Sequence, residues 1–177
     1  MLTIDRESSH LLIVDFQSKL MPAIHEGERA VANAKRLIEA AKLLEVPTLF
    51  TEQNAKGLGP TVAEIAPDNS ILAHKMYFDA CREPDFLARL QKRPNIVVAG
   101  CEAHVCVQQT VLGLLDAGRK VYLVRDALGA RHPENKETAI RRMERHGAEI
   151  VTTEMVVFEW LATASHPRFR EAVALIK

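Results

Sequence analysis

Short apolar runs alternate along the chain with longer segments in which apolar residues recur every three or four positions. Six of these runs are rich in Val, Ile or Leu and show no polar alternation, which is typical of strands buried on both faces of a sheet. They cover residues 10–16, 47–51, 71–75, 95–100, 120–125 and 149–152. Strands separated by helical segments predict an α/β fold with a mostly parallel six-stranded sheet and helices on both faces.

The segments between the runs predict the covering helices. Apolar residues at helical spacing over 31–44 predict the first of them. Further helices are predicted at 85–90, 105–117 and 133–145, followed by two short helices within 155–177 that are broken at Pro167. Pro133 suits a first helical turn, and Gly118 and Gly147 suit helix ends. The irregular segment 52–68, with one short helix expected at 61–65, either connects elements on the surface or covers a site.

Length and composition narrow the class of protein. A chain of 177 residues predicts a single domain, 1–177, that needs neither a disulfide nor a metal ion to fold. The 23 basic and 23 acidic residues balance, which argues against nucleic acid as a partner. The first apolar run is too short for a signal peptide, and no run reaches the length of a membrane span. We therefore expect a cytoplasmic protein with no membrane partner.

Three polar residues follow the apolar part of predicted strands. Asp15 ends the first strand, Lys75 ends the third, and Cys106 comes shortly after the fourth. Each alone has an ordinary explanation: a capping carboxylate, a solvated lysine and a packed small residue. Because the carboxyl ends of parallel strands share one edge of a sheet, however, all three are expected to meet where such folds bind ligands.

A carboxylate, an ammonium group and a thiol at one edge suit nucleophilic catalysis. The thiolate is the reactive form of cysteine, and a thiol beside Lys75 and a helix N-terminus is expected to ionise more easily. Asp15 would take the proton of Cys106 and later deliver it to the leaving group. Backbone N–H groups in the turn before the helix would stabilise an oxyanion.

Three segments resemble the motifs of isochorismatase-like cysteine hydrolases, in the family's order. They are the run 11–17 (LLIVDFQ), Lys75 with Phe78 nearby, and the run 100–110 (GCEAHVCVQQT); the likeness extends from about residue 10 to residue 160. The resemblance implies a doubly wound, Rossmann-like sheet in the order 3-2-1-4-5-6. It also implies a catalytic triad of Asp15, Lys75 and Cys106.

The same resemblance implies a mechanism. A non-proline cis peptide between Cys101 and Glu102 would help to form the oxyanion hole, with the N–H groups of Glu102 and Cys106 as donors. Family members mostly hydrolyse small amides or related C–N bonds through an acyl-enzyme, and Cys106 places the chain with this amide-type branch. The substrate would be a small molecule, and no cofactor is required.

The chain departs from one branch of the family. Nicotinamidases carry an Asp-x-His metal motif after the second strand, where this chain has Thr51-Glu52-Gln53 and no histidine. We therefore expect no metal ion, and a pyridine amide held by a metal is disfavoured as substrate. The pattern instead resembles an uncharacterised subgroup of hydrolases.

Further side chains are expected to form the substrate pocket. The apolar candidates are Phe16, Leu20, Tyr77 and Phe78, and the polar candidates are Gln17 and Gln53. His104 lies two residues before the nucleophile, and either a direct chemical role or a place in the pocket wall is open to it. The family resemblance and the apolar helices near the C-terminus favour a homo-oligomer.

Two functions of other classes stay open at this point. The first is a thiol-based redox sensor, in which Cys106 is oxidised and then forms a disulfide with Cys101. The second is a binding protein that keeps the scaffold without turnover.

Overall fold

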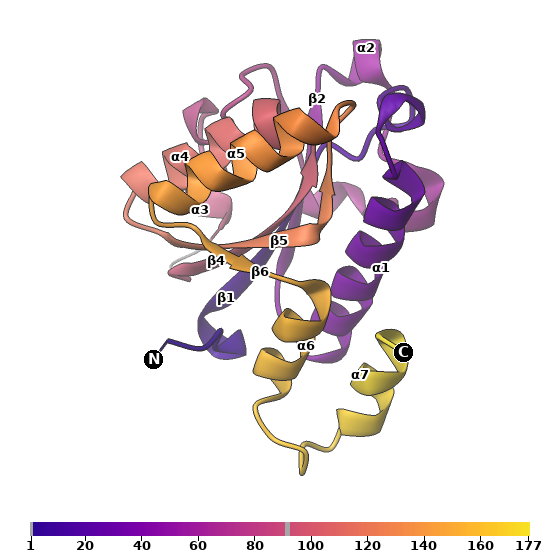
Figure 1. Ribbon diagram of the computed structural model, residues 1–177, viewed down its shortest axis with the longest axis vertical. Helices are drawn as coiled ribbons and strands as arrows, with labels where there is room; N and C mark the ends of the chain where they lie inside the picture. The colour runs from indigo at the N-terminus through magenta and orange to yellow at the C-terminus, as the bar shows by residue number, and fades with distance from the viewer. Residues whose placement is uncertain (1, 91–92) are drawn as a thin grey trace.

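A computed structural model describes residues 2–90 and 93–177 of the chain, and its centre is a single sheet (Figure 1). The sheet has six strands in the order β3-β2-β1-β4-β5-β6, and every neighbouring pair is parallel. The strands are β1 (Ser9–Val14), β2 (Thr48–Gln53), β3 (Leu72–Lys75), β4 (Asn95–Cys101), β5 (Lys120–Gly129) and β6 (Glu149–Val151). This confirms the predicted fold class and strand order.

Helices cover both faces of the sheet (Figure 1). On one face lie α1 (Gly27–Leu43), α6 (Thr153–Leu161) and α7 (Phe169–Leu175), and on the other α3 (Phe86–Arg89), α4 (Gln108–Asp116) and α5 (Pro133–Arg145). The short helix α2 (Ala55–Leu58) follows β2. Turns of 3-10 helix occur at Arg6–Ser8, Met21–Ala23, Ala63–Ile65, Asn69–Ile71 and Ala80–Arg82. Within the two described ranges, no helix is both long and apolar enough to span a bilayer.

The core consists of two layers, one on each face of the sheet. Successive side chains of β1 point to opposite faces. Leu11 and Ile13 accordingly pack beneath α1, whereas Leu12 and Val14 pack in the layer of α4 and α5. Burial on both faces explains why the strands read as unbroken apolar runs.

Two elements differ from the sequence prediction. Strand β5 continues to Gly129 instead of ending at residue 125. Asp126 interrupts the apolar pattern there because its Oδ1 accepts hydrogen bonds from the backbone N–H (2.8 Å) and the hydroxyl (3.0 Å) of Thr153, the first residue of α6. The helix expected at 105–117 begins with a π-helical turn, Ala103–Val107, and becomes α-helical only at Gln108.

Candidate active site

The carboxyl ends of β1 and β3 bring a carboxylate and an ammonium group into contact. Asp15 follows the last residue of β1 in a left-handed conformation (φ 50°), and Lys75 is the last residue of β3. Lys75 Nζ lies 2.7 Å from Asp15 Oδ2, and each side chain is only 1% exposed. Two charges so completely removed from water are compatible with folding only because each neutralises the other.

The two oxygens of the Asp15 carboxylate have different surroundings. Oδ1 accepts a hydrogen bond from the hydroxyl of Thr51 on β2, at 2.7 Å. Oδ2 lies 2.7 Å from Lys75 Nζ as an ion pair, and no hydrogen bond to it is found among the described residues. Asp15 therefore keeps one buried oxygen with unused capacity to accept a proton.

The Lys75 ammonium group is oriented by Gln53, the last residue of β2. Lys75 Nζ donates to Gln53 Oε1 at 2.8 Å and to the carbonyl of Tyr77 at 3.5 Å. Gln53 Nε2 in turn donates to the carbonyl of Met76 at 2.8 Å. Since both ends of the amide are engaged, Gln53 holds its oxygen toward Lys75.

Gln17 lies behind these residues and is completely buried. Its Nε2 donates to the carbonyls of Gln53 (3.0 Å) and Gly59 (2.6 Å), while its Oε1 accepts from the N–H of Gln53 (2.8 Å). All of these partners are backbone groups. Gln17 thus fastens the loop that carries α2 to the end of β2.

Cys106 lies in the π-helical turn after β4, and its residue is 6% exposed. The pKa of the Cys106 thiol is raised to about 12: burial contributes most to the rise, the Asp15 carboxylate adds to it, and Lys75 opposes both. The sequence-based expectation that this thiol ionises more easily than usual is therefore wrong for the resting site. Burial and the nearby carboxylate outweigh the ammonium group.

The other two cysteines are also free thiols. Cys101 ends β4 with no exposure, and burial raises the pKa of its thiol. The peptide bond from Cys101 to Glu102 is cis. Cys81 is half-buried on the 3-10 turn after β3, and burial raises the pKa of its thiol to about 12.

A cavity of about 350 Å³ opens onto the Cys106 thiol. It is lined by Leu20, Ala23, Gln53, Leu58, Phe78, Glu102, Val105, Cys106 and Arg131. The wall is largely apolar, and the polar groups are few, which is the usual composition of a small-molecule site.

Only some of the expected pocket residues line this cavity. Leu20, Gln53 and Phe78 do. The others lie elsewhere: Phe16 is in the core, Gln17 is behind the site, Tyr77 packs against the Arg82 guanidinium, and His104 Nε2 lies 3.5 Å from Asn135 Nδ2.

The sequence reasoning missed four residues that line the cavity: Ala23, Leu58, Val105 and Arg131. Arg131 comes after the end of β5, and Leu58 belongs to α2. The position of Leu58 in the irregular segment 52–68 was the one available signal for it. No sequence pattern pointed to Arg131, because its position beside the cavity depends on where β5 ends.

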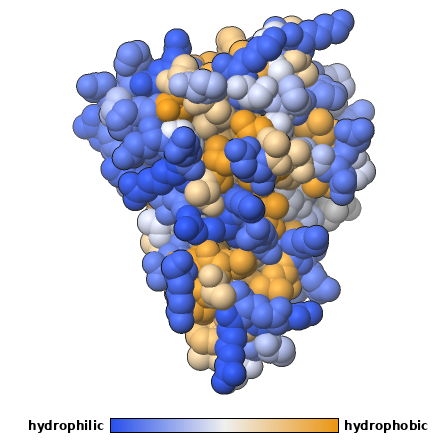
Figure 2. Space-filling model, turned by 90° about the vertical axis from the view of Figure 1, so that its right-hand side faces the viewer, coloured by the Kyte–Doolittle hydropathy of each residue, from blue (hydrophilic) through white to orange (hydrophobic). Residues whose placement is uncertain are grey.

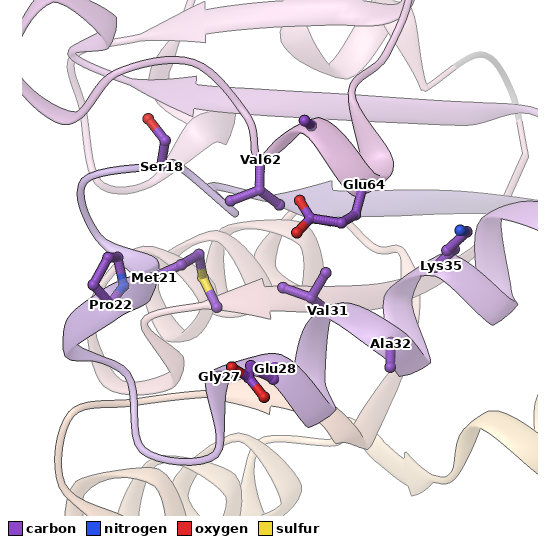
Figure 3. A pocket seen from close by; sticks show the side chains of 11 residues that line it. Ser18, Met21, Pro22, Gly27, Glu28, Val31, Ala32, Lys35, Val62 and Glu64 are labelled. Carbon is purple, nitrogen blue, oxygen red and sulfur yellow. The ribbon is translucent and has the colours of Figure 1, made fainter.

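A larger hollow, of about 690 Å³, shares no lining residue with this cavity. Figure 3 shows the side chains around it. It is lined by Ser18, Met21, Pro22, Gly27, Glu28, Val31, Ala32, Lys35, Val62, Ala63 and Glu64. Figure 2 shows apolar surface between polar side chains on the side of the molecule that carries α1. Since no thiol and no buried ion pair faces this hollow, its size alone does not make it the reaction site.

The described residues were examined for a group that could hold a metal ion. No group of three His, Cys, Asp or Glu side chains within 2–90 and 93–177 has the geometry to hold a metal ion. Glu52, in the segment where a metal motif was sought, accepts hydrogen bonds at Oε1 from the N–H (2.6 Å) and the hydroxyl (2.8 Å) of Thr61. Its carboxylate therefore fixes a loop.

Comparison with known proteins gives consistent matches along most of the chain. Residues 9–155 match the family described as Isochorismatase domain. Isochorismatase domain-containing protein 2 of Xenopus laevis is 38% identical over 172 residues, which are 96% of this chain and 83% of that protein. The Homo sapiens protein of the same name is 36% identical, with 96% and 83% covered. The MAR1 ribonuclease of Caenorhabditis elegans superposes with a TM-score of 0.93 at 35% identity, over 98% of this chain and 92% of the other.

Proposed function

The chain belongs to the isochorismatase family, and we propose on this premise that it is a hydrolase of small amides or related C–N bonds that acts through an acyl-enzyme on Cys106. One observation carries the proposal. The Cys106 thiol lines a cavity and is influenced at close range by both members of the buried Asp15–Lys75 pair.

The first half of the reaction forms the acyl-enzyme. Cys106 attacks the substrate carbonyl carbon while its proton passes to Asp15 Oδ2, the oxygen with unused acceptor capacity. The backbone N–H groups of Glu102 and Cys106 are the proposed donors to the oxyanion. When the C–N bond breaks, Asp15 returns the proton to the departing nitrogen, which leaves as a neutral amine or as ammonia.

The second half releases the acid. A water molecule gives a proton to Asp15 and attacks the thioester carbonyl; the C–S bond breaks, and the sulfur regains a proton from Asp15. Lys75 Nζ, 2.7 Å from Asp15 Oδ2, holds the carboxyl group in place between these transfers. The raised pKa of Cys106 fits this sequence, since the thiol stays protonated until a substrate arrives and then loses its proton during attack.

Ribonuclease activity is a second candidate because of the name of the C. elegans relative. Cleavage of RNA requires contacts to a polyanionic backbone, which basic side chains normally provide. This chain carries 23 basic and 23 acidic residues, and Arg131, the one cation among the described residues that line the cavity, is paired with Glu102. The charge distribution therefore favours a small substrate over RNA.

A homo-oligomer is part of the proposal. Met76, Tyr77 and Phe78 lie directly after Lys75 and are 69%, 48% and 50% exposed. Consecutive exposed apolar residues of this size are unusual on a monomer and typical of an interface. Light scattering of the purified protein tests this, and a strictly monomeric protein would contradict it.

The activity itself is tested with a substrate panel. Wild type, Cys106→Ala and the control Cys81→Ala are assayed against small primary amides, hydroxamates, carbamoyl compounds and a structured RNA. We expect hydrolysis of at least one C–N compound by wild type and Cys81→Ala and none by Cys106→Ala. Full turnover by Cys106→Ala would show the mechanism to be wrong, and cleavage of RNA that depends on Cys106 would favour the second candidate.

The same proteins separate the two functions left open by the sequence. A redox sensor would form a reversible Cys101–Cys106 disulfide in mild peroxide, which intact mass spectrometry detects as a loss of two hydrogens. A binding protein would show ligand-dependent melting without any acyl adduct on Cys106.

A further inference from the structure

Among the residues that line the cavity at Cys106, two carry charge, and they contact each other. Arg131 Nε donates to Glu102 Oε2 at 3.1 Å, and the backbone N–H of Arg131 donates to the same oxygen at 3.0 Å. Glu102 immediately precedes the turn that holds the nucleophile. The pair is therefore part of the wall that a substrate meets.

Both partners of this pair are ionised. Burial alone raises the pKa of the Glu102 carboxyl, but the two hydrogen bonds from Arg131 and its charge outweigh burial, and the net pKa is lowered. The Glu102 side chain is only 8% exposed, so its charge is held at a fixed place. The Arg131 guanidinium is permanently charged.

The pair leaves part of its hydrogen-bonding capacity unused. Glu102 Oε1 and the two terminal nitrogens of Arg131 make no hydrogen bond with the residues described here. The Arg131 side chain is 54% exposed, and Arg131 is one of the residues that line the cavity. An acceptor and two donors thus stand side by side.

The charges around the cavity sum to zero. Glu102 offsets Arg131 in the wall, and Asp15 offsets Lys75 behind the thiol. A substrate carboxylate attracted by Arg131 would be repelled by Glu102. A substrate ammonium group attracted by Glu102 would be repelled by Arg131. Neither charge therefore gains from entering the cavity.

We infer that the substrate is electrically neutral and carries, away from the scissile carbonyl, a group that both donates and accepts hydrogen bonds, such as a carboxamide or a ureido group. Glu102 and Arg131 are the residues that determine this specificity, because together they match a donor and an acceptor and reject a lone charge. The inference rests on the proposed function and adds the substrate class to it.

Two thiol reagents of equal size test the inference without a known substrate. Iodoacetamide is neutral and iodoacetate is anionic, and mass spectrometry of the peptide that contains Cys106 gives the labelling rate with each. For each protein, the rate with iodoacetate is divided by the rate with iodoacetamide. This ratio is then divided by the same ratio measured for glutathione, which corrects for the different intrinsic reactivity of the two reagents. The proteins compared are wild type, Glu102→Gln, Arg131→Gln and the control Glu137→Gln, which breaks a surface pair with Arg125 (2.8 Å) outside the cavity wall.

The inference predicts opposite changes of the normalised labelling ratio in the two variants of the pair. Wild type should label no faster with iodoacetate than with iodoacetamide on the normalised scale. Glu102→Gln leaves the charge of Arg131 without its partner and should raise the ratio about 5-fold, whereas Arg131→Gln leaves Glu102 alone and should lower it by a similar factor. Glu137→Gln should leave the ratio unchanged.

Other results would overturn the inference in distinguishable ways. A wild-type preference for iodoacetate, or Glu102→Gln and Arg131→Gln ratios equal to that of wild type, would refute the neutral-substrate inference and leave the proposed function standing. Full turnover of a panel amide by protein whose Cys106 has been completely labelled would contradict the nucleophile itself and both proposals with it. Circular dichroism of each variant verifies that it is folded.

Discussion

Replacing Asp15 by Asn is expected to make Cys106 more reactive as a thiol while abolishing hydrolysis. Burial and the Asp15 carboxylate raise the pKa of the Cys106 thiol from its ordinary value of 9.0 to about 12. Thiolate at neutral pH is therefore much rarer than for an ordinary cysteine. Part of that difference disappears with the carboxylate.

The size of the effect follows from the charges in contact. A neighbouring charge typically moves a pKa by about 1 to 3 units. Asp15→Asn removes the charge that raises the pKa of Cys106 and keeps Lys75, which lowers it. We expect the apparent pKa to fall by about one unit or more, and labelling by iodoacetamide at pH 8 to accelerate roughly 10-fold. Lys75→Met removes the opposing charge and should slow the same labelling.

The assay follows labelling of individual cysteines by peptide mass spectrometry between pH 7 and pH 9, beside turnover of a panel substrate. Cys81 serves as an internal control because its raised pKa is due to burial and Asp79, not to Asp15. Its labelling rate should not change. The reasoning would be refuted if the Cys106 labelling rate changed in the same direction in Asp15→Asn and Lys75→Met. Turnover by Asp15→Asn near the wild-type rate would also refute it.

Three further changes have definite expected outcomes. Burial lowers the pKa of His10 from 6.5 to about 4, so the free energy of unfolding that this neutral side chain supports above pH 6.5 falls by ~3 kcal/mol as the pH drops toward 4. In urea unfolding at a series of pH values, His10→Gln should lose less stability over this range, and the same pH dependence as wild type would contradict the reasoning. A Cβ at Gly100 would lie 2.5 Å from the carbonyl oxygen of Val14 on the adjacent strand, so Gly100→Ala should lower the free energy of unfolding by about 3 kcal/mol, and a loss below about 1 kcal/mol would show that the strands can separate. Gln53→Met removes the acceptor of Lys75 and should lower kcat by about 10-fold with little change in KM; a change confined to KM would assign Gln53 to substrate binding instead.

The fold was predictable because the pattern of apolar residues differs clearly between its strands and its helices. Each strand buried on both faces appears as an unbroken apolar run, and each covering helix has a periodic one. The end of β5 was not predictable, because Asp126 reads as the end of a strand until its bonds with Thr153 of α6 are seen. The register of β5 against β4 also shifts between Val98 and Gly100, which no local pattern indicates.

The contact between Asp15 and Lys75 could be predicted from the sequence, whereas the electrostatics at Cys106 could not. Asp15 and Lys75 were expected at one edge of the sheet, and they are in contact there. The direction of the pKa change at Cys106 depends on how deeply the thiol is buried, which the sequence does not reveal. The pairing of Glu102 with Arg131 joins residues 29 positions apart and depends on where two strands end.

Trapping the intermediate tests the central claim most directly. Wild type is mixed with a hydrolysable amide from the panel, quenched in acid within milliseconds, and examined by intact-protein and peptide mass spectrometry. The account predicts a mass increase equal to the acyl group, located on Cys106, sensitive to hydroxylamine and absent from Cys106→Ala. Rapid turnover with no adduct at any quench time, or an adduct on another residue, would contradict it.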